Sequence, residues 1–197
     1  GAVTDNPLVF PRSATAGDIV SGGNFHGMPL AIPLDTLAVA MTHIAGISER
    51  RVNWLLTASD SENPVNPYLS PQPGLHSGLM IAQYTAAACV NEMMTLATPA
   101  SVGNIPTSAG IEDYNSMGAT AAHKAMRSMR LLESVIAIEL LTMCEAMEYQ
   151  RPLKSGAAVE RAIAVVRSVV PKLTADRPPS PDIAAIETLI RSGRFAL

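Results

Sequence analysis

Apolar residues recur at helical spacing over most of the chain. Between residues 29 and 58 such positions include Leu34, Leu37, Ala38, Met41, Ile44, Ala45, Ile47 and Val52. Similar patterns predict further helices over residues 75–97, 117–149, 157–170 and 181–192. The alternation of apolar and polar residues that marks a half-buried strand is almost absent. The pattern therefore predicts an all-α bundle.

The helix expected over residues 117–149 is long and apolar around much of its circumference. Its apolar positions include Leu131, Leu132, Val135, Ile136, Ile138, Leu140, Leu141 and Met143. A helix that is apolar nearly all round is buried on most sides. We therefore expect the bundle to be embedded in a larger assembly.

Three segments rich in proline, glycine and small polar residues separate the expected helices. They cover about residues 1–27, 59–74 and 98–116. The first of them, up to residue 23, is predicted as loop and turn. Pro29 and Pro33 are compatible only with the first turns of the helix that follows.

The chain of 197 residues is 48% hydrophobic and 16% charged, with a net charge of −3. Soluble domains carry roughly 25% charged residues, so much of this surface is expected to meet other protein. No cluster of lysine and arginine exists, which argues against a nucleic-acid partner. Charged residues interrupt the apolar runs, which argues against a membrane span. The run Ser48-Glu49-Arg50-Arg51 is predicted to form a structural ion pair.

Cys89 and Cys144 lie inside apolar helical patterns, so they are interpreted as core residues of a protein from a reducing compartment. No basic and then apolar signal segment is visible, and we expect a cytoplasmic location. His43, His76 and His123 lack the spacing of metal ligands, so no metal site is expected. The chain begins without methionine, which suggests a piece of a longer protein.

The stretch SGGNFHG, residues 21–27, precedes the first predicted helix. Glycine allows close approach of the backbone to another group. One interpretation is a turn in which Asn24 caps the helix and Phe25 fills the core. The other places Asn24, Phe25 and His26 in a pocket at a helix N-terminus, where backbone N–H groups favour a substrate carboxylate.

The stretch PTSAGIEDYNSMG, residues 106–118, precedes the most apolar helix. Ionisable groups that enter a buried bundle are costly unless they are paired or used. In one interpretation Asp113 and Asn115 cap the helix while Glu112 is solvated. In the other, Glu112 is an acid, a base or an ammonium-binding group.

Several motifs occur together in a fixed order. They are DNPLVF (5–10), SGGNFHG (21–27), ISERR (47–51), GLHSGLMIAQYTAAA (74–88), PASVGNIPTSAGIEDYNSMG (99–118) and PSPDI (179–183). Together they resemble the C-terminal part of the aromatic amino-acid ammonia-lyase and aminomutase family, to which histidine ammonia-lyase belongs. The resemblance covers essentially the whole chain. It implies that residues 1–197 are the C-terminal helical part of the histidine ammonia-lyase-like fold, and that the full-length protein is a homotetramer.

The resemblance also implies a chemistry for a small amino-acid substrate. Family members use 4-methylideneimidazol-5-one (MIO), an electrophile formed from an internal Ala-Ser-Gly that these 197 residues do not contain. The fragment alone is therefore expected to be inactive, with the MIO-forming half absent. Carried over by position, Phe25 packs beside the MIO group, Asn24 lies close by and Glu112 reaches the substrate pocket.

Departures from the family patterns suggest a subtype. Histidine ammonia-lyases usually read FHGEP or FHAEP, whereas here Met28 replaces the acid; their NQEDH becomes GIEDY at residues 110–114. Phenylalanine and tyrosine ammonia-lyases generally carry glutamine in place of Glu112. The combination most resembles bacterial tyrosine 2,3-aminomutases of enediyne biosynthesis, which implies conversion of L-tyrosine to a β-amino acid. Asn24, His26, Met28 and Tyr114 are then substrate-binding residues. The alternative is an ammonia-lyase for histidine, tyrosine or phenylalanine.

Overall fold

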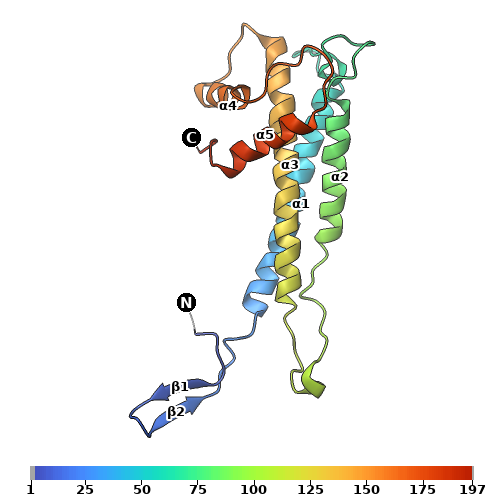
Figure 1. Cartoon of the computed structure of the whole chain (residues 1–197). Coiled ribbons are helices and arrows are strands. Elements are labelled where there is room, and N and C mark those ends of the chain that lie inside the picture. Colours follow the sequence, from blue (N-terminus) through green and yellow to red (C-terminus); the bar gives the residue numbers. More distant parts are fainter. Residues whose placement is uncertain (1–2, 197) are drawn as a thin grey trace. The chain divides into compact units, whose positions relative to one another are not determined.

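The computed structural model describes residues 3–196 and is mainly helical in that part of the chain (Figure 1). Its strands and helices are β1 (Leu8–Pro11), β2 (Gly17–Val20), α1 (Met28–Leu56), α2 (Met80–Leu96), α3 (Gly118–Gln150), α4 (Ala157–Arg167) and α5 (Ser180–Arg191). Two short 3₁₀ turns, Pro67–Leu69 and Ser108–Gly110, lie in the connections. The predicted helical class is confirmed. Four helices lie within three residues of their expected bounds, whereas α2 begins five residues later than expected, after a turn at residues 75–79.

The N-terminal segment differs from the prediction of loop and turn. There, β1 and β2 form an antiparallel hairpin in which Leu8 lies opposite Val20 and Pro11 lies opposite Gly17. The N–H groups of two residues in the turn bond to the carbonyl of Ala16, which closes the hairpin. The strands are only four residues long, and apolar side chains are exposed on both of their faces. The strands therefore lack the alternation of apolar and polar residues from which a strand is predicted.

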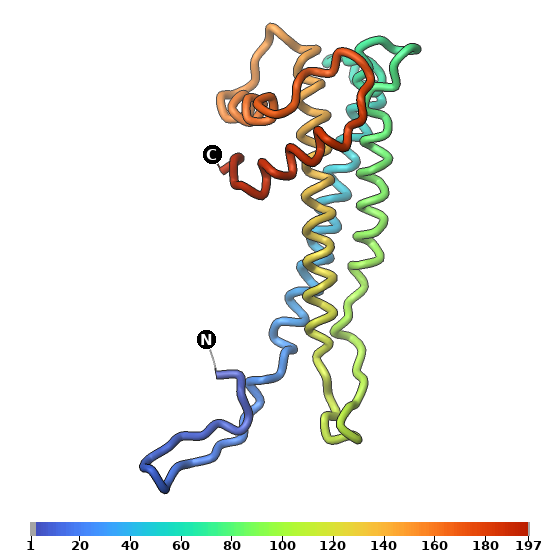
Figure 2. Tube along the Cα trace, in the orientation of Figure 1, coloured from blue at the N-terminus to red at the C-terminus, as the bar shows by residue number. Residues whose placement is uncertain are grey.

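The chain divides into two compact units. In the described part of the chain, the first consists of residues 3–39 and 96–126, and the second of residues 40–95 and 127–196. Both α1 and α3 contribute residues to each unit. Figure 2 follows the trace, in which the N-terminal hairpin belongs to the first unit and the two C-terminal helices to the second. The predicted site residues all fall in the first unit.

The main apolar core lies in the second unit, where α4 and α5 accompany the C-terminal part of α3. Its buried members include Val52, Leu56, Leu69, Leu79, Ala82, Ala86, Ile138, Leu141, Val166, Val170 and Ile186. Every residue from 131 to 150 is buried or half-buried, whereas residues 119–130 include many exposed ones. Burial of the long helix on most sides is thus confirmed for its C-terminal part.

Charged residues of α1 are held by hydrogen bonds in this second unit. Glu49 is nearly buried, pairs with Arg50 at 2.6 Å and accepts the amide of Gln83 at 2.7 Å. Arg51 pairs with Glu139 at 2.9 Å. Burial acts to raise the pKa of the Glu49 carboxyl, but these hydrogen bonds and the charge of Arg50 hold its pKa below the usual value. The predicted structural ion pair is confirmed.

The length and low polarity of α1 meet the test for a membrane-spanning helix. An 18-residue window within it has a mean hydropathy of 1.6, although the core helix of a soluble protein meets the same test. Two carboxylates of α1, Asp35 and Glu49, are buried against hydrogen-bond donors of the protein. The expected lack of a membrane span stays a prediction.

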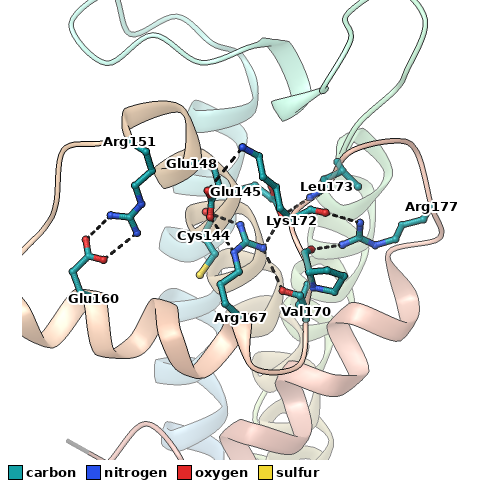
Figure 3. A network of polar contacts seen from close by, with 11 residues as sticks. Cys144, Glu145, Glu148, Arg151, Glu160, Arg167, Val170, Lys172, Leu173 and Arg177 are labelled. Atoms are coloured by element: carbon teal, nitrogen blue, oxygen red, sulfur yellow. Dashed lines mark hydrogen bonds and ion pairs between the residues drawn. The ribbon is translucent and has the colours of Figure 1, made fainter.

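Arg167, at the end of α4, lies among acceptors of α3 (Figure 3). Its guanidinium donates to Glu145 Oε1 at 2.8 Å, to Glu148 Oε1 at 3.2 Å and to the Cys144 carbonyl at 3.0 Å. Glu145 is 3% exposed and also accepts the backbone N–H of Leu173 at 3.1 Å. Burial lowers the pKa of the Arg167 guanidinium, but its bond to Glu145 and that residue's charge outweigh burial and raise its pKa. This contact fastens α4 to α3.

Replacing Arg167 by methionine should destabilise the protein strongly. The substitution leaves the Glu145 carboxylate buried without its charge partner, and breaking a buried pair in this way costs about 3–5 kcal/mol. We expect a loss of that order in the free energy of unfolding measured in urea. Arg191→Met is the matched control, because Arg191 pairs with Glu133 at 2.7 Å while its side chain is 51% exposed. That variant should lose at most about 1 kcal/mol, and equal losses would contradict the argument.

The two cysteines should differ in reactivity. Both are free, and Cys144 is buried whereas Cys89 is half-buried. Burial raises the pKa of the Cys144 thiol to about 11. At pH 8 only about one Cys144 in a thousand is therefore a thiolate, the form that reacts. A thiol reagent added to the native protein at pH 8 should modify Cys89 first, and denaturation should remove the difference. Faster native labelling of Cys144, measured by peptide mass spectrometry, would contradict this.

Candidate functional site

His26 links the SGGNFHG segment to the second motif loop. Its Nδ1 accepts the N–H of Met28 at 3.3 Å, in the first turn of α1. Its Nε2 lies 3.0 Å from the Tyr114 carbonyl, which can only accept, so Nε2 carries the proton. The imidazole also stacks against the Tyr114 ring, with centroids 6.0 Å apart and an interplanar angle of 22°. One side chain thus joins two segments that are far apart in the sequence.

The second loop passes close to the backbone at Gly27. A Cβ atom added to Gly27 would lie 2.8 Å from the Ser116 hydroxyl oxygen, so the Ser116 side chain would have to shift to admit it. By contrast, Cβ atoms at Gly22 and Gly23 would meet no heavy atom within 4 Å. The segment is therefore tightly packed at its C-terminal end and open at its glycine pair.

The interpretation of SGGNFHG as a simple capped turn is wrong in two respects. Phe25 is 57% exposed and does not fill the core of this chain. The first-turn N–H of Met28 bonds to the His26 ring, and no bond from α1 to the exposed Asn24 side chain is found in residues 3–196. The His26 imidazole instead accepts the first N–H of α1. Met28 itself is half-buried.

Glu112 closes a short hairpin-like turn with Thr107. The Thr107 N–H bonds to the Glu112 carbonyl at 3.0 Å, and the Glu112 N–H bonds to the Thr107 carbonyl at 3.3 Å. Between them, Ser108, Ala109 and Gly110 have left-handed φ values of 53°, 55° and 88°. Such a conformation costs about 1–2 kcal/mol at each non-glycine residue. Strain of this kind persists where surrounding contacts enforce it, and it often marks functional sites.

The Asn115 and Asn104 side chains supply those contacts. Asn115 donates from its amide to the Ile105 carbonyl at 2.7 Å, and its backbone N–H donates to Asn104 Oδ1 at 2.8 Å. The Asn104 amide in turn donates to the Asp113 carbonyl at 2.7 Å. The expectation that Asn115 caps the long helix is therefore wrong, because its side chain is used inside the loop. The first N–H of α3, from Gly118, bonds to the Ser116 hydroxyl at 3.3 Å instead.

Asp35 of α1 anchors the beginning of the same loop. Its carboxylate accepts the Ser101 N–H at 2.8 Å and lies 3.7 Å from the Lys124 ammonium, which also donates to the Thr98 carbonyl. Burial acts to raise the pKa of the Asp35 carboxyl. Hydrogen bonds from Ser101, a backbone hydrogen bond from Ala100 and the Lys124 charge together hold the pKa below its usual value. The loop is thus fastened at both ends, by Asp35 and by His26.

The structure brings part of the predicted site together. His26 and Tyr114 are in direct contact, and Glu112 lies two residues before Tyr114 in the fastened loop. Asn24 and Phe25 directly precede the linking histidine, and both are exposed. Within residues 3–196, no group of three or more His, Cys, Asp or Glu side chains is placed to hold a metal ion.

A model of aromatic amino acid lyases matches residues 1–168. The chain belongs to this family. It is 50% identical over 196 residues to a histidine ammonia-lyase of Anaeromyxobacter sp. (strain K). This match covers 100% of this chain and 38% of that protein. The crystal structure of histidine ammonia-lyase from Trypanosoma cruzi matches with a TM-score of 0.90 and 43% identity, over 98% of this chain and 37% of that one.

Aminomutases of the family share the fold as well. The tyrosine aminomutase structure from Streptomyces globisporus matches with a TM-score of 0.89 and 32% identity, over 98% of this chain and 36% of that one. The chain thus spans less than two fifths of the length of these lyase-family relatives. The predicted histidine ammonia-lyase-like fold is confirmed.

Several residues that shape this lyase-family loop were not predicted from the sequence. They are Asp35, Asn104 and Thr107, whose bonds join positions well apart along the chain or within the loop. Asn and Thr in a loop are typical of turn chemistry, which was the available signal. Their partners depend on the loop path, which a pattern of residues does not specify.

Replacing His26 by phenylalanine should loosen both segments. The ring can still pack against Tyr114, but the two nitrogen contacts to backbone groups are lost. Each such hydrogen bond contributes about 1 kcal/mol, so losing one should raise the equilibrium constant for local opening roughly fivefold. Hydrogen exchange of peptides that cover residues 26–30 and 111–116 should rise accordingly. His123→Phe, at an exposed histidine of α3, is the control and should leave these peptides unchanged. Equal exchange in wild type and His26→Phe would refute the link.

Proposed function

We propose that the chain is the C-terminal part of an MIO-dependent ammonia-lyase that acts on histidine or a close analogue. The observation that carries this proposal is the 50% identity with a histidine ammonia-lyase over 196 residues. The exposed Glu112, held in a fastened loop, supports it because a carboxylate in that position is accessible to a ligand. The Ala-Ser-Gly that forms MIO would lie in the part of the longer protein that this chain does not span.

The residues present fit the MIO group. The backbone at Gly22 and Gly23 has open space beside it. Two residues after Gly23, the apolar ring of Phe25 is exposed. An aromatic face can pack against a planar heterocycle. When bound, MIO supplies the electrophile that activates the substrate amine as a leaving group. Phe25 and Asn24 would hold that group, and the open glycine pair lets the backbone pass close to it.

Glu112 would bind the substrate ammonium group and accept a proton from it. One carboxylate oxygen, Oε2, accepts the Thr107 hydroxyl at 2.8 Å. The other oxygen can accept a proton from the ammonium group, which must become a free amine before it reacts as a nucleophile. A positioned carboxylate of this kind provides general base catalysis. Tyr114 and Met28 would line the region of the side chain that differs between substrates.

Conversion of tyrosine to a β-amino acid is the second candidate. It is favoured by Met28, Ile111 and Tyr114, which replace residues typical of histidine ammonia-lyases, and by the likeness to a tyrosine aminomutase structure. In that reaction the amine returns to the β-carbon rather than leaving as ammonia. A place in enediyne antibiotic biosynthesis would follow only from this second candidate.

The surface supports an assembly of the full-length protein. Large apolar side chains of α1 are exposed in each unit: Leu30, Ile32 and Leu37 in the first, and Ile44, Ile47 and Trp54 in the second. Such surfaces mark contacts with other protein. We propose that the remaining part of the protein and further copies cover them in a cytoplasmic homotetramer, without nucleic acid or membrane as partners.

A product assay on the full-length protein tests the function. With L-histidine and L-tyrosine supplied separately, we expect ammonia and urocanate from L-histidine, resolved by chromatography and mass spectrometry. β-Tyrosine from L-tyrosine would replace the first candidate by the second. Coumarate alone would indicate a lyase for an aromatic substrate, and no product from either amino acid would refute both candidates.

Glu112→Gln tests the role of the carboxylate in the same assay. The amide is nearly the same size but cannot accept the substrate proton, so we expect kcat to fall by about 10²–10⁴-fold. Glu62→Gln is the control, because Glu62 is an exposed carboxylate in the loop before α2. It should leave kcat unchanged. Equal activity of Glu112→Gln and wild type would show that Glu112 is only a solvated loop residue.

A further inference from the structure

We propose that Thr107 is the positioning residue that sets the Glu112 carboxylate, and this inference rests on the proposed function of Glu112. The Thr107 hydroxyl lies 2.8 Å from Glu112 Oε2. The hydroxyl donates this hydrogen bond, and the carboxylate accepts it. Thr107 itself does not need to touch a substrate for this role.

The direction of this hydrogen bond follows from the third member of the cluster. The Asn115 amide nitrogen lies 3.3 Å from Thr107 Oγ1, and an amide NH₂ group can only donate. The threonine oxygen therefore accepts from Asn115, and its single proton is free to point to Glu112. The result is a directed chain of donors that runs from Asn115 through Thr107 to the carboxylate.

The start of the chain is itself fixed. The Asn115 amide also donates to the Ile105 carbonyl at 2.7 Å, so its orientation is not free. Its backbone N–H is held by Asn104 Oδ1 at 2.8 Å. The amide nitrogen has one further acceptor, the Glu112 carbonyl at 3.5 Å, and the short bond to Ile105 directs its second N–H group toward Thr107 and Glu112. The Thr107 hydroxyl is thereby oriented by the loop rather than by solvent.

The backbone places the two side chains opposite each other. Thr107 and Glu112 exchange two N–H to carbonyl hydrogen bonds, at 3.0 Å and 3.3 Å, as a closely paired couple of residues does in an antiparallel ladder. Paired residues of this kind carry side chains on the same side. The left-handed turn at residues 108–110 holds the pair in register. The carboxylate is thus restrained before a substrate arrives, which spares the ordering cost during the reaction.

Thr107→Val tests the inference in the full-length protein. Valine keeps the shape and the extended backbone preference of threonine but removes the hydroxyl. We expect kcat to fall by about 10- to 100-fold, the scale that follows from misplacing a reacting group, with KM changed less than about threefold. Thr107→Ser should restore kcat to within about threefold of wild type, because it returns the donor. Thr188→Val, which removes an exposed hydroxyl of α5, should have no effect.

Two further readouts separate positioning from a general loss of structure. In the Glu112→Gln background, Thr107→Val should lower kcat by less than about twofold, because two residues that act as a unit are not additive. A crystal structure of the Thr107→Val protein should show the Glu112 carboxylate displaced with the 107–112 backbone pairing intact. If valine disrupts folding, judged by thermal unfolding, Thr107→Ala replaces it in the same comparisons.

The outcomes also separate this inference from the proposed function. Wild-type-like kcat in Thr107→Val, or an unmoved carboxylate in its crystal structure, would overturn the positioning role while leaving the activity in place. An additive loss in the Glu112→Gln background would overturn it too. If wild type forms no product from L-histidine or L-tyrosine, the proposed function fails, and the crystal structure alone decides whether Thr107 sets the carboxylate.

Discussion

Hydrogen bonds from side chains to backbone groups outside the helices organise the first unit of the molecule. The motif loops contain little regular structure that could pair their own N–H and C=O groups, and each hydrogen bond contributes about 1 kcal/mol. Side chains take the role instead. His26 serves backbone groups of both motif segments, and Asn104 and Asn115 serve carbonyls within the second loop. The identity of the residues that hold the loops therefore matters as much as the identity of those that would contact a substrate.

In the second unit, hydrogen bonds and ion pairs compensate for the burial of charged side chains. Helices there bury carboxylates at Glu49 and Glu145, each with an arginine and a further hydrogen-bond donor. A buried charge without partners would cost far more than a surface one. The contact between Glu49 and Gln83 joins α1 to α2, and the contact between Glu145 and Arg167 joins α3 to α4, so these two contacts help to fix which helix faces meet. The unit is thus a helical core with a small number of polar contacts that determine its register.

Helices were predictable from the sequence because their apolar spacing reflects burial on one face, as at Ala38, Ala45 and Val52. The hairpin at Leu8–Val20 was not predictable, because its short strands expose apolar residues on both faces and carry no alternation. Of the candidate site, the motif residues could be named from the family resemblance. The contact between His26 Nε2 and the Tyr114 carbonyl could not, since it depends on the path of a loop more than eighty residues further along the chain.

The left-handed residues of the second loop have a consequence for its conformational entropy. Ser108 and Ala109 occupy a region of backbone space that glycine would enter with less strain. Glycine in their place would also enlarge the ensemble of the unfolded loop and raise the entropy lost on ordering. Serine and alanine accept a local enthalpic penalty in exchange for a smaller set of alternative loop shapes. The turn is stiff because its residues have few other conformations, and that stiffness is inherited by the carboxylate it carries.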